Sequence, residues 1–433
     1  MRMDLRHPTL DKLIERRRFG VKPGLGTIRA LMAELGDPQD ALKCIHVAGT
    51  NGKGSVVAKT DAVLRAAGFR TARYTSPHLV SVNERFFIEG SPANDGALES
   101  AAAKVLPAVE RIEARLGTPV TFFESLTAVA FVLFSEVEPD AVVLETGLGG
   151  RLDATNVIVP QSVLASVFTR IGLDHCAWLG NTVADIAAEK AGIIKRGRPV
   201  AVGAQPPEAL SVISAAANEN GCPVYLSQVP LLQGFVKENE ETVRTVISIL
   251  RNEHGWRIDD DAVAAGLRDA VWPGRFQHVV SDGADVYVDG AHNPDGAAAL
   301  KAALESSGAR RPFGLIAGFC GDKDVLAHLR ILAPDVSAGW SVPIRNERSL
   351  DPERTAAFMR EAGIREVAAC RSLVEAIEAG KRWLGATGGT LVVCGSLFLA
   401  GEALVALGAY PWSASGVDQN ESISAASGLG GRR

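Results

Sequence analysis

The stretch Cys44-Ile-His-Val-Ala-Gly-Thr-Asn-Gly-Lys-Gly-Ser55 decides the fold class of this 433-residue chain. Its first five residues are mostly apolar or β-branched and predict a buried strand. Gly49–Gly54 then predicts a glycine-rich turn, and Ser55–Ala67 predicts a helix that ends at Gly68. A strand, a tight turn and a helix in this order are typical of an α/β protein with a parallel sheet and crossover helices.

The same alternation recurs along the chain in two series, which predicts two α/β domains. Further strands are expected in the first series at Arg70–Tyr74, Ala141–Glu145, Ser162–Phe168 and Pro199–Val202. The second series predicts strands at Asp285–Val288, Phe313–Ala317, Ala338–Val342 and Thr390–Cys394, and helices at Asp295–Glu305, Val325–Leu332, Pro352–Glu361 and Leu373–Trp383.

A domain boundary is expected near Ala270–Arg275, where Pro273 and Gly274 interrupt the pattern. This places one domain at residues 1–272 and a second at 273–412. Residues 413–433 are rich in Ser and Gly and poor in apolar residues, so we expect a disordered tail.

Composition narrows the function classes. The chain has 45 basic and 50 acidic residues and a net charge of −5, so no broad cationic surface for nucleic acid is expected. The six cysteines are scattered without a C-x-x-C pair, which argues against a zinc site and favours a reducing cytoplasm. Neither a signal peptide nor an apolar run of about 18 residues is found, so no membrane partner is expected.

The glycine-rich turn Gly49–Ser55 is a candidate phosphate-binding loop. Small residues between a strand and a helix let backbone N–H groups approach phosphate oxygens, and Lys53 would reach the β- and γ-phosphates. The strict P-loop pattern is absent because Gly54 separates Lys53 from Ser55. The alternative is a glycine-rich turn whose lysine is solvated.

With further motifs in order, this loop resembles the folylpolyglutamate synthase/dihydrofolate synthase family of the Mur-ligase superfamily, over about residues 10–410. The resemblance implies a Mur-ligase-like fold, with a P-loop ATPase-type central domain, a mostly parallel sheet and a smaller Rossmann-like C-terminal α/β domain. The motifs that carry it, besides the loop, are Tyr74-Thr-Ser-Pro-His-Leu79, Thr121-Phe-Phe-Glu124, Leu144–Asn156, Gly172-Leu-Asp-His175, Glu189-Lys-Ala-Gly-Ile193, Trp272-Pro-Gly-Arg-Phe276, Asp289-Gly-Ala-His-Asn-Pro294, Asp322-Lys-Asp324 and Cys394–Glu402.

The resemblance also implies the nucleotide site. Lys53, Lys190 and His292 are expected to be catalytic, and His292 would polarise the acyl phosphate or orient a neighbour. Arg275 is expected to contact ATP together with Asp289, although an interdomain ion pair is an alternative for Arg275. The full set expected to bind ATP is Gly49, Thr50, Asn51, Gly52, Lys53, Gly54, Ser55, Asn239, Arg275 and Asp289. The family's His-Gln pair before the asparagine is replaced by Phe235-Val236.

Glu145 is a candidate magnesium ligand on the residues alone, because it ends an apolar strand where ligands bind in open α/β sheets. A salt-bridged strand-end acid is the alternative. The resemblance implies that Ser76, Glu145 and His175 hold Mg²⁺, although a histidine is an unusual ligand for this ion. It further implies that Lys190 is carbamylated and serves a second Mg²⁺, whereas the sequence pattern alone indicates a solvated helix lysine. The sequence leaves open whether K⁺ is required.

The resemblance implies that the acceptor acid contacts Phe123, Glu124 and Asp153, where stacking and hydrogen bonding suit a heterobicycle. The phenylalanine could equally belong to the core. The N-terminal loop departs from the family, because Gly24-Leu-Gly-Thr27 stands where the family has Gly-Leu-Glu-Arg. Two charged groups of the expected pteroate pocket are thereby lost.

Together these features predict a cytoplasmic, monomeric, ATP-dependent amide ligase. It would join L-glutamate to dihydropteroate, to the γ-carboxylate of a folate, or to both, through an acyl phosphate. Three alternatives stay open: a Mur-type ligase for another acid and amino acid, a P-loop phosphotransferase or ATPase, and a non-catalytic nucleotide-binding protein.

Overall fold

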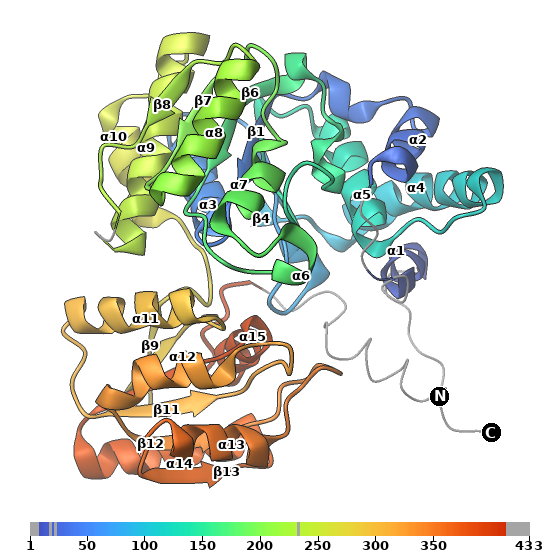
Figure 1. Cartoon of the computed structure of the whole chain (residues 1–433). Coiled ribbons are helices and arrows are strands. Elements are labelled where there is room, and N and C mark those ends of the chain that lie inside the picture. The colour runs from blue at the N-terminus through green and yellow to red at the C-terminus, as the bar shows by residue number, and fades with distance from the viewer. Residues whose placement is uncertain (1–7, 17–19, 21–23, 232–233, 413–433) are drawn as a thin grey trace. The chain divides into compact units, whose positions relative to one another are not determined.

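The computed structural model describes residues 8–16, 20, 24–231 and 234–412, so the predicted tail at 413–433 lies outside the described residues. The chain divides into two compact units. The first runs to His78 and resumes from Val82 to Val271. The second contains Leu79–Ser81 and continues from Trp272 (Figure 1).

Unit 1 is built on an eight-stranded sheet with the order β4-β3-β2-β5-β1-β6-β7-β8. The six strands from β2 to β8 in this order are parallel, whereas β3 and β4 are antiparallel. The bounds are β1 Cys44–Ala48, β2 Thr71–Tyr74, β3 Phe86–Ile88, β4 Ser91–Pro92, β5 Ala141–Glu145, β6 Val163–Phe168, β7 Val200–Val202 and β8 Val224–Leu226.

Helices cover both faces of this sheet because its central strands are apolar on both sides. Ile45 and Val47 of β1 pack in one core with α3, α9 and α10, whereas Cys44 belongs to the core under α4 and α5. A further core joins β7 to α7 and α8 (Figure 1). The helices are α1 Pro8–Ile14, α2 Gly26–Glu34, α3 Lys53–Ala66, α4 Asp95–Leu116, α5 Phe122–Val137, α6 Cys176–Leu179, α7 Val183–Ala191, α8 Pro207–Glu219, α9 Phe235–His254 and α10 Asp260–Asp269, with 3₁₀ turns η2 Pro38–Ala41, η3 Val82–Arg85, η4 Ala154–Val157 and η5 Pro160–Ser162.

Unit 2 has a six-stranded sheet with the order β13-β12-β11-β14-β10-β9, in which β9 alone of the described strands is antiparallel. Helices α14 and α15 contribute to one core and α11, α12 and α13 to another. The bounds are β9 Gln277–Ser281, β10 Ala284–Val288, β11 Phe313–Ala317, β12 Val336–Ser341, β13 Glu366–Ala369, β14 Thr390–Cys394, α11 Pro294–Ser306, α12 Val325–Leu332, η6 Ala333–Asp335, α13 Pro352–Glu361, α14 Leu373–Thr387 and α15 Leu397–Ala406.

The predicted α/β class with mostly parallel sheets is confirmed, and the differences are local. Helix α3 begins at Lys53, two residues before the expected start, because Gly52 already closes the turn with a φ of 91°. Helix α14 runs four residues past the expected end and stops where Gly388 takes a φ of 65°. Strand β12 begins two residues early, at Val336.

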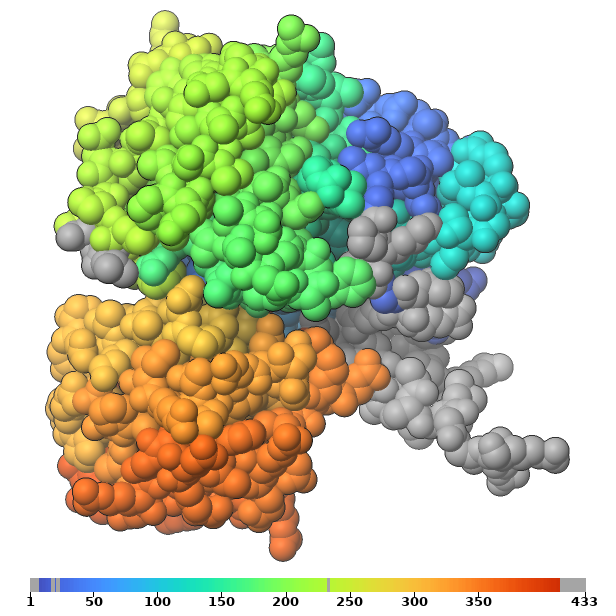
Figure 2. All heavy atoms as spheres, in the orientation of Figure 1, coloured from blue at the N-terminus to red at the C-terminus, as the bar shows by residue number. Residues whose placement is uncertain are grey.

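The missed strands β3, β4, β8, β9 and β13 are short or partly exposed, so none of them gives a long buried apolar run. The space-filling view of Figure 2 shows the surface that the atoms of each unit form on this face. All six cysteines are free. None of the helices among the described residues is long and apolar enough to cross a membrane.

Candidate functional site

The loop after β1 ends on the open N-terminus of a long helix. Gly52 is the N-cap of α3, and no side chain caps this end. The first-turn N–H groups of an uncapped helix attract anions through hydrogen bonding and the helix dipole. Strand β1 lies between β5 and β6, at the point where the crossovers leave in opposite directions, and ligands bind at such points in open α/β sheets.

Two glycines in this loop allow close approaches that a side chain would prevent. A Cβ atom on Gly49 would lie 1.9 Å from the Thr169 hydroxyl oxygen. A Cβ atom on Gly52 would lie 2.3 Å from Oδ1 of Asn239. The structure therefore brings Asn239, from α9, against the loop as the prediction for the nucleotide site requires.

Two ammonium groups converge on one carbonyl of the loop. Lys53 Nζ donates to the oxygens of Gly49 and Thr50, each at 3.1 Å, and Lys190 Nζ donates to Gly49 O at 2.8 Å. Lys190 is only 4% exposed. Burial, and secondly the charge of Lys53, lowers the pKa of Lys190 to about 7. Neutral amine is therefore available near physiological pH, which a solvated lysine would not provide.

Helix α7 holds Lys190 in place. Thr182 is the N-cap of this helix, and Thr182 and Asp185 form a reciprocal capping box. The far end of the helix packs on the glycine-rich loop after β5, where a Cβ atom on Gly150 would lie 2.8 Å from the Lys190 carbonyl oxygen. The motif around Gly150 therefore fixes where the lysine emerges.

Glu145 and Ser76 meet at the carboxyl ends of β5 and β2. The Ser76 N–H donates to Glu145 Oε2 at 3.1 Å, and Glu145 is 4% exposed. The Glu145 carboxylate offers the kind of oxygen ligand that Mg²⁺ prefers, which water and phosphate would complete. Within the described ranges, no group of three or more His, Cys, Asp or Glu forms a metal cluster, so any site here depends on such added ligands.

His175 lies in the turn that begins α6. Its φ is 52°, its side chain is 49% exposed, and its Nε2 lies 3.9 Å from Asp174 Oδ2. The same turn is tied to the phosphate loop, because the Thr50 hydroxyl donates to Gly172 O at 3.0 Å and accepts from Gly172 N at 3.1 Å. The sequence motif pointed to His175 as a ligand, but no sequence pattern indicates the link between Gly172 and Thr50.

The three expected acceptor contacts have structural partners as well. The Phe123 ring lies 6.0 Å from the ring of Tyr74, and a Cβ atom on Gly147 would touch it at 2.4 Å. Glu124 Oε2 accepts from the N–H and hydroxyl of Thr121, each at 2.8 Å, in the capping box of α5. The Thr-x-x-Glu spacing was a signal for this capping role.

Asp153 is buried and accepts three hydrogen bonds. Leu148 N donates to Oδ2 at 2.8 Å, and the N–H and hydroxyl of Thr155 donate to Oδ1 at 3.0 and 2.5 Å. Burial raises the pKa of Asp153, while these bonds lower it. The carboxylate therefore also holds the loop between β5 and β6 in shape.

In unit 2, the turn after β10 is held by Asp289. Its Oδ2 accepts from Phe276 N and its Oδ1 from Ala291 N, both at 2.7 Å. Burial raises the pKa of Asp289, opposed first by the charge of Arg275. His292 Nδ1 lies 2.8 Å from Gly290 O. Asp289 and His292 thus share this turn, and Arg275, which precedes β9, lies beside it, because a Cβ atom on Gly290 would lie 3.0 Å from an Arg275 guanidinium nitrogen.

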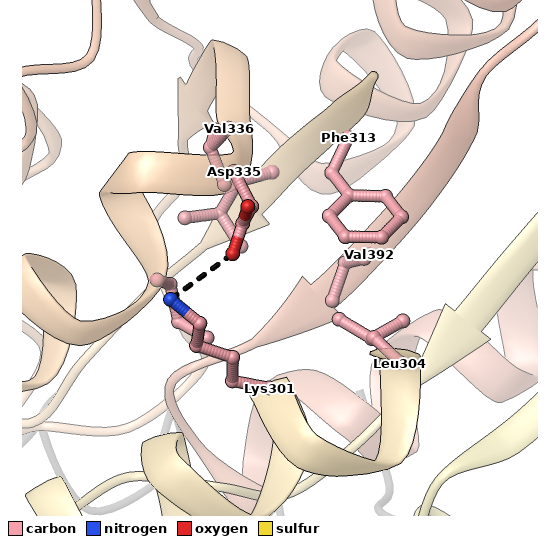
Figure 3. A pocket seen from close by; sticks show the side chains of 8 residues that line it. Lys301, Leu304, Phe313, Asp335, Val336 and Val392 are labelled. Atoms are coloured by element: carbon pink, nitrogen blue, oxygen red, sulfur yellow. Dashed lines mark ion pairs between the residues drawn. The ribbon is translucent and has the colours of Figure 1, made fainter. Parts of the chain in front are cut away.

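A small pocket of unit 2 lies apart from all these residues. It is lined mainly by apolar side chains between α11, η6 and the sheet, and Lys301 Nζ pairs with Asp335 Oδ2 at 3.1 Å (Figure 3). None of the predicted site residues lines it. The candidate functional residues therefore gather at strand ends and not in this pocket.

Comparison with known proteins gives matches along most of the chain. Residues 274–397 match the family model "Mur ligase, glutamate ligase domain". The dihydrofolate synthase/folylpolyglutamate synthase of Bacillus subtilis is 39% identical over 340 residues, which cover 71% of this chain and 78% of that protein.

Solved structures give the same result. Mycobacterium tuberculosis folylpolyglutamate synthase, complexed with ADP and AMPPCP, is 31% identical with a TM-score of 0.85, over 94% of this chain and 99% of that chain. E. coli FolC in complex with DHPP and ADP is 28% identical with a TM-score of 0.81, over 93% of this chain and 98% of that chain.

Proposed function

Because the chain belongs to the folylpolyglutamate synthase/dihydrofolate synthase family of Mur ligases, we propose that it joins L-glutamate to dihydropteroate and to the γ-carboxylate of a folate, at one acceptor site. The enzyme is an ATP-dependent ligase. The observation that carries the residue assignment is the convergence of Lys53 and Lys190 on Gly49 O, beside the uncapped start of α3.

We assign the loop Gly49–Ser55 to the phosphates of ATP. A carboxylate oxygen of the acceptor attacks the γ-phosphorus of ATP, and the bond between this phosphorus and the bridging β-phosphate oxygen breaks. ADP departs, and the acceptor is now an acyl phosphate. Lys53 and the first N–H groups of α3 stabilise charge on the transferred group. Asn239, packed against Gly52, lies within this assigned site.

The amide bond then forms by a second displacement. The neutral amine of L-glutamate attacks the acyl carbon, the C–O bond to phosphate breaks, and the amine loses a proton. Exclusion of water during this step protects the acyl phosphate from hydrolysis. We assign Arg275, Asp289 and His292 of unit 2 to ATP binding and acyl-phosphate chemistry on the family resemblance.

Glu145 and Ser76 would hold Mg²⁺, with His175 as the third ligand that the family resemblance implies. The ion would neutralise phosphate charge when bound. The buried carboxylate of Glu145 supports this assignment, since Mg²⁺ prefers carboxylate oxygen and the Ser76 N–H holds this carboxylate in place.

We also assign a carbamate to Lys190. Its neutral amine would attack the carbon of CO₂ and lose a proton, which gives an anionic oxygen ligand for a second Mg²⁺. The lowered pKa of Lys190 supports this step because only the unprotonated amine is nucleophilic. Enzyme equilibrated with ¹³C-bicarbonate should show a carbamate carbon resonance by NMR, and Lys190→Ala should lack it.

The experiment that tests the function is a paired assay. Purified enzyme is given ATP, Mg²⁺ and radiolabelled glutamate, with either dihydropteroate or tetrahydrofolate as the acid. We expect labelled product and stoichiometric ADP from both. Product from one acid alone would limit the enzyme to one addition, and ADP without labelled product would contradict the ligase assignment.

A further inference from the structure

Gln205, which follows β7, clamps the backbone that follows the neighbouring strand β6. Its Oε1 accepts from Ile171 N at 3.0 Å, and its Nε2 donates to Thr169 O at 2.8 Å and more weakly to Phe168 O at 3.4 Å. The amide orientation is fixed by its partners, because a backbone N–H can only donate and a carbonyl can only accept.

The clamped segment supports the phosphate loop on its other side. Arg170 O accepts from the N–H groups of Thr50 and Asn51, at 3.0 and 3.2 Å. Gly172 exchanges two hydrogen bonds with the Thr50 side chain. Gln205 therefore binds the two residues on either side of Arg170, and within the part of the chain that the structure describes it forms no hydrogen bond to the loop itself.

We propose that Gln205 is a positioning residue for ATP binding, acting through Thr169–Gly172 on Gly49–Asn51. The room for adjustment is small, because a Cβ atom on Gly49 would already lie 1.9 Å from the Thr169 hydroxyl. A shift of this segment moves the carbonyls of Gly49 and Thr50, which hold the Lys53 ammonium. The proposal rests on the proposed function, since it takes Gly49–Ser55 as the ATP-binding loop.

Two substitutions separate the parts of the clamp. Gln205→Met keeps the length of the side chain and removes both kinds of hydrogen bond. Gln205→Glu keeps the acceptor for Ile171 N and loses the donor to Thr169 O. The matched control is Gln228→Met, because Gln228 is an exposed glutamine of the same unit whose Nε2 donates to Leu226 O, away from the loop.

We expect both Gln205 variants to raise the KM for ATP and the Kd for ADP by about five- to tenfold, the scale of one lost buried hydrogen bond. The KM for glutamate should change by less than about twofold, because the clamp acts on the phosphate loop. Gln228→Met should match the wild type. Melting temperatures are measured in parallel, and kinetics are run well below them.

A purely structural role would lower the melting temperature and leave the KM for ATP unchanged, and that result would overturn the proposal. If Gln205→Met fails to fold, Gln205→Glu tests the proposal by the same comparison of the KM for ATP with the melting temperature. Titration of ADP by calorimetry measures binding without ligation. An unchanged ADP affinity in the Gln205 variants refutes the positioning role of Gln205. A wild-type enzyme that binds ADP but does not ligate refutes the proposed function instead.

Discussion

Two strand-end turns, one in each unit, differ in how their charged groups are balanced. In the turn after β1, Lys53 and Lys190 donate hydrogen bonds to backbone carbonyl oxygens. Within the described residues, neither ammonium group forms an ion pair with a carboxylate. The turn after β10 instead gives each oxygen of Asp289 a backbone N–H donor.

The difference teaches where a ligand is needed. The positive charge of Lys53 at an uncapped helix start is stabilised by an added anion. The pKa of Lys190 is lowered first by burial and secondly by the charge of Lys53, while the charges of Asp174 and Asp153 oppose this shift. Asp289 already has the partners that a buried carboxylate requires. The first turn therefore leaves room for an added anion, whereas the backbone donors of the second turn hold its own shape.

Lys53→Ala should produce the largest effect. Loss of the ammonium that faces the transferred phosphoryl group should lower kcat/KM by about 100- to 1000-fold, with little change in melting temperature. The control is Lys59→Ala on the same helix, where the lysine pairs with Glu240 instead of the loop. If Lys53→Ala ligates at the wild-type rate, the assignment of the turn after β1 to phosphate binding is wrong.

Asp289→Ala should act on stability. Two backbone N–H groups lose their acceptors, and we expect the free energy of unfolding to fall by about 2 kcal/mol. Chemical denaturation measures it. Asp282→Ala is the control, because Asp282 is 85% exposed and pairs with Lys381 at the surface. An unchanged unfolding free energy in Asp289→Ala would break the contrast between the two turns.

Lys190 gives a pH-dependent prediction of intermediate size. Its pKa of about 7 lies below that of an unfolded lysine, so the unfolded chain binds more protons between about pH 7 and pH 10. The unfolding free energy should therefore rise with pH across this window in CO₂-free buffer. Lys190→Met should remove that part of the slope, whereas Lys104→Met, at an exposed ion pair, should retain it.

Glu124→Gln should have the smallest effect and tests the first unit's acceptor contacts. Glutamine preserves the capping box with Thr121, so the melting temperature should hold, whereas Glu124→Ala should cost about 1 kcal/mol. Loss of the negative charge in Glu124→Gln should raise the KM for dihydropteroate about threefold, which corresponds to the free energy of one weak polar contact. An unchanged KM would restrict Glu124 to capping.

Local patterns predicted much of the fold. Strands β1, β5, β11 and β14 have the expected bounds, because each is a short apolar run that ends at glycine or a polar residue. The glycine-rich turn Gly49–Gly54 was recognisable for the same reason. Strand β9 was not, because its residue types do not follow its alternating exposure: Val279 is buried, whereas the neighbouring Val280 is exposed.

The sequence by itself determined the α/β class, the glycine-rich turn and the motifs of the family, since these depend on residue types at short spacing. Only the tertiary structure decided that Lys190 shares the Gly49 carbonyl with Lys53, that Leu79–Ser81 belongs to unit 2, and that Gln205 binds the backbone of Thr169 and Ile171. Those contacts join segments far apart in the chain, and burial sets the pKa of Lys190, so no local pattern can contain them.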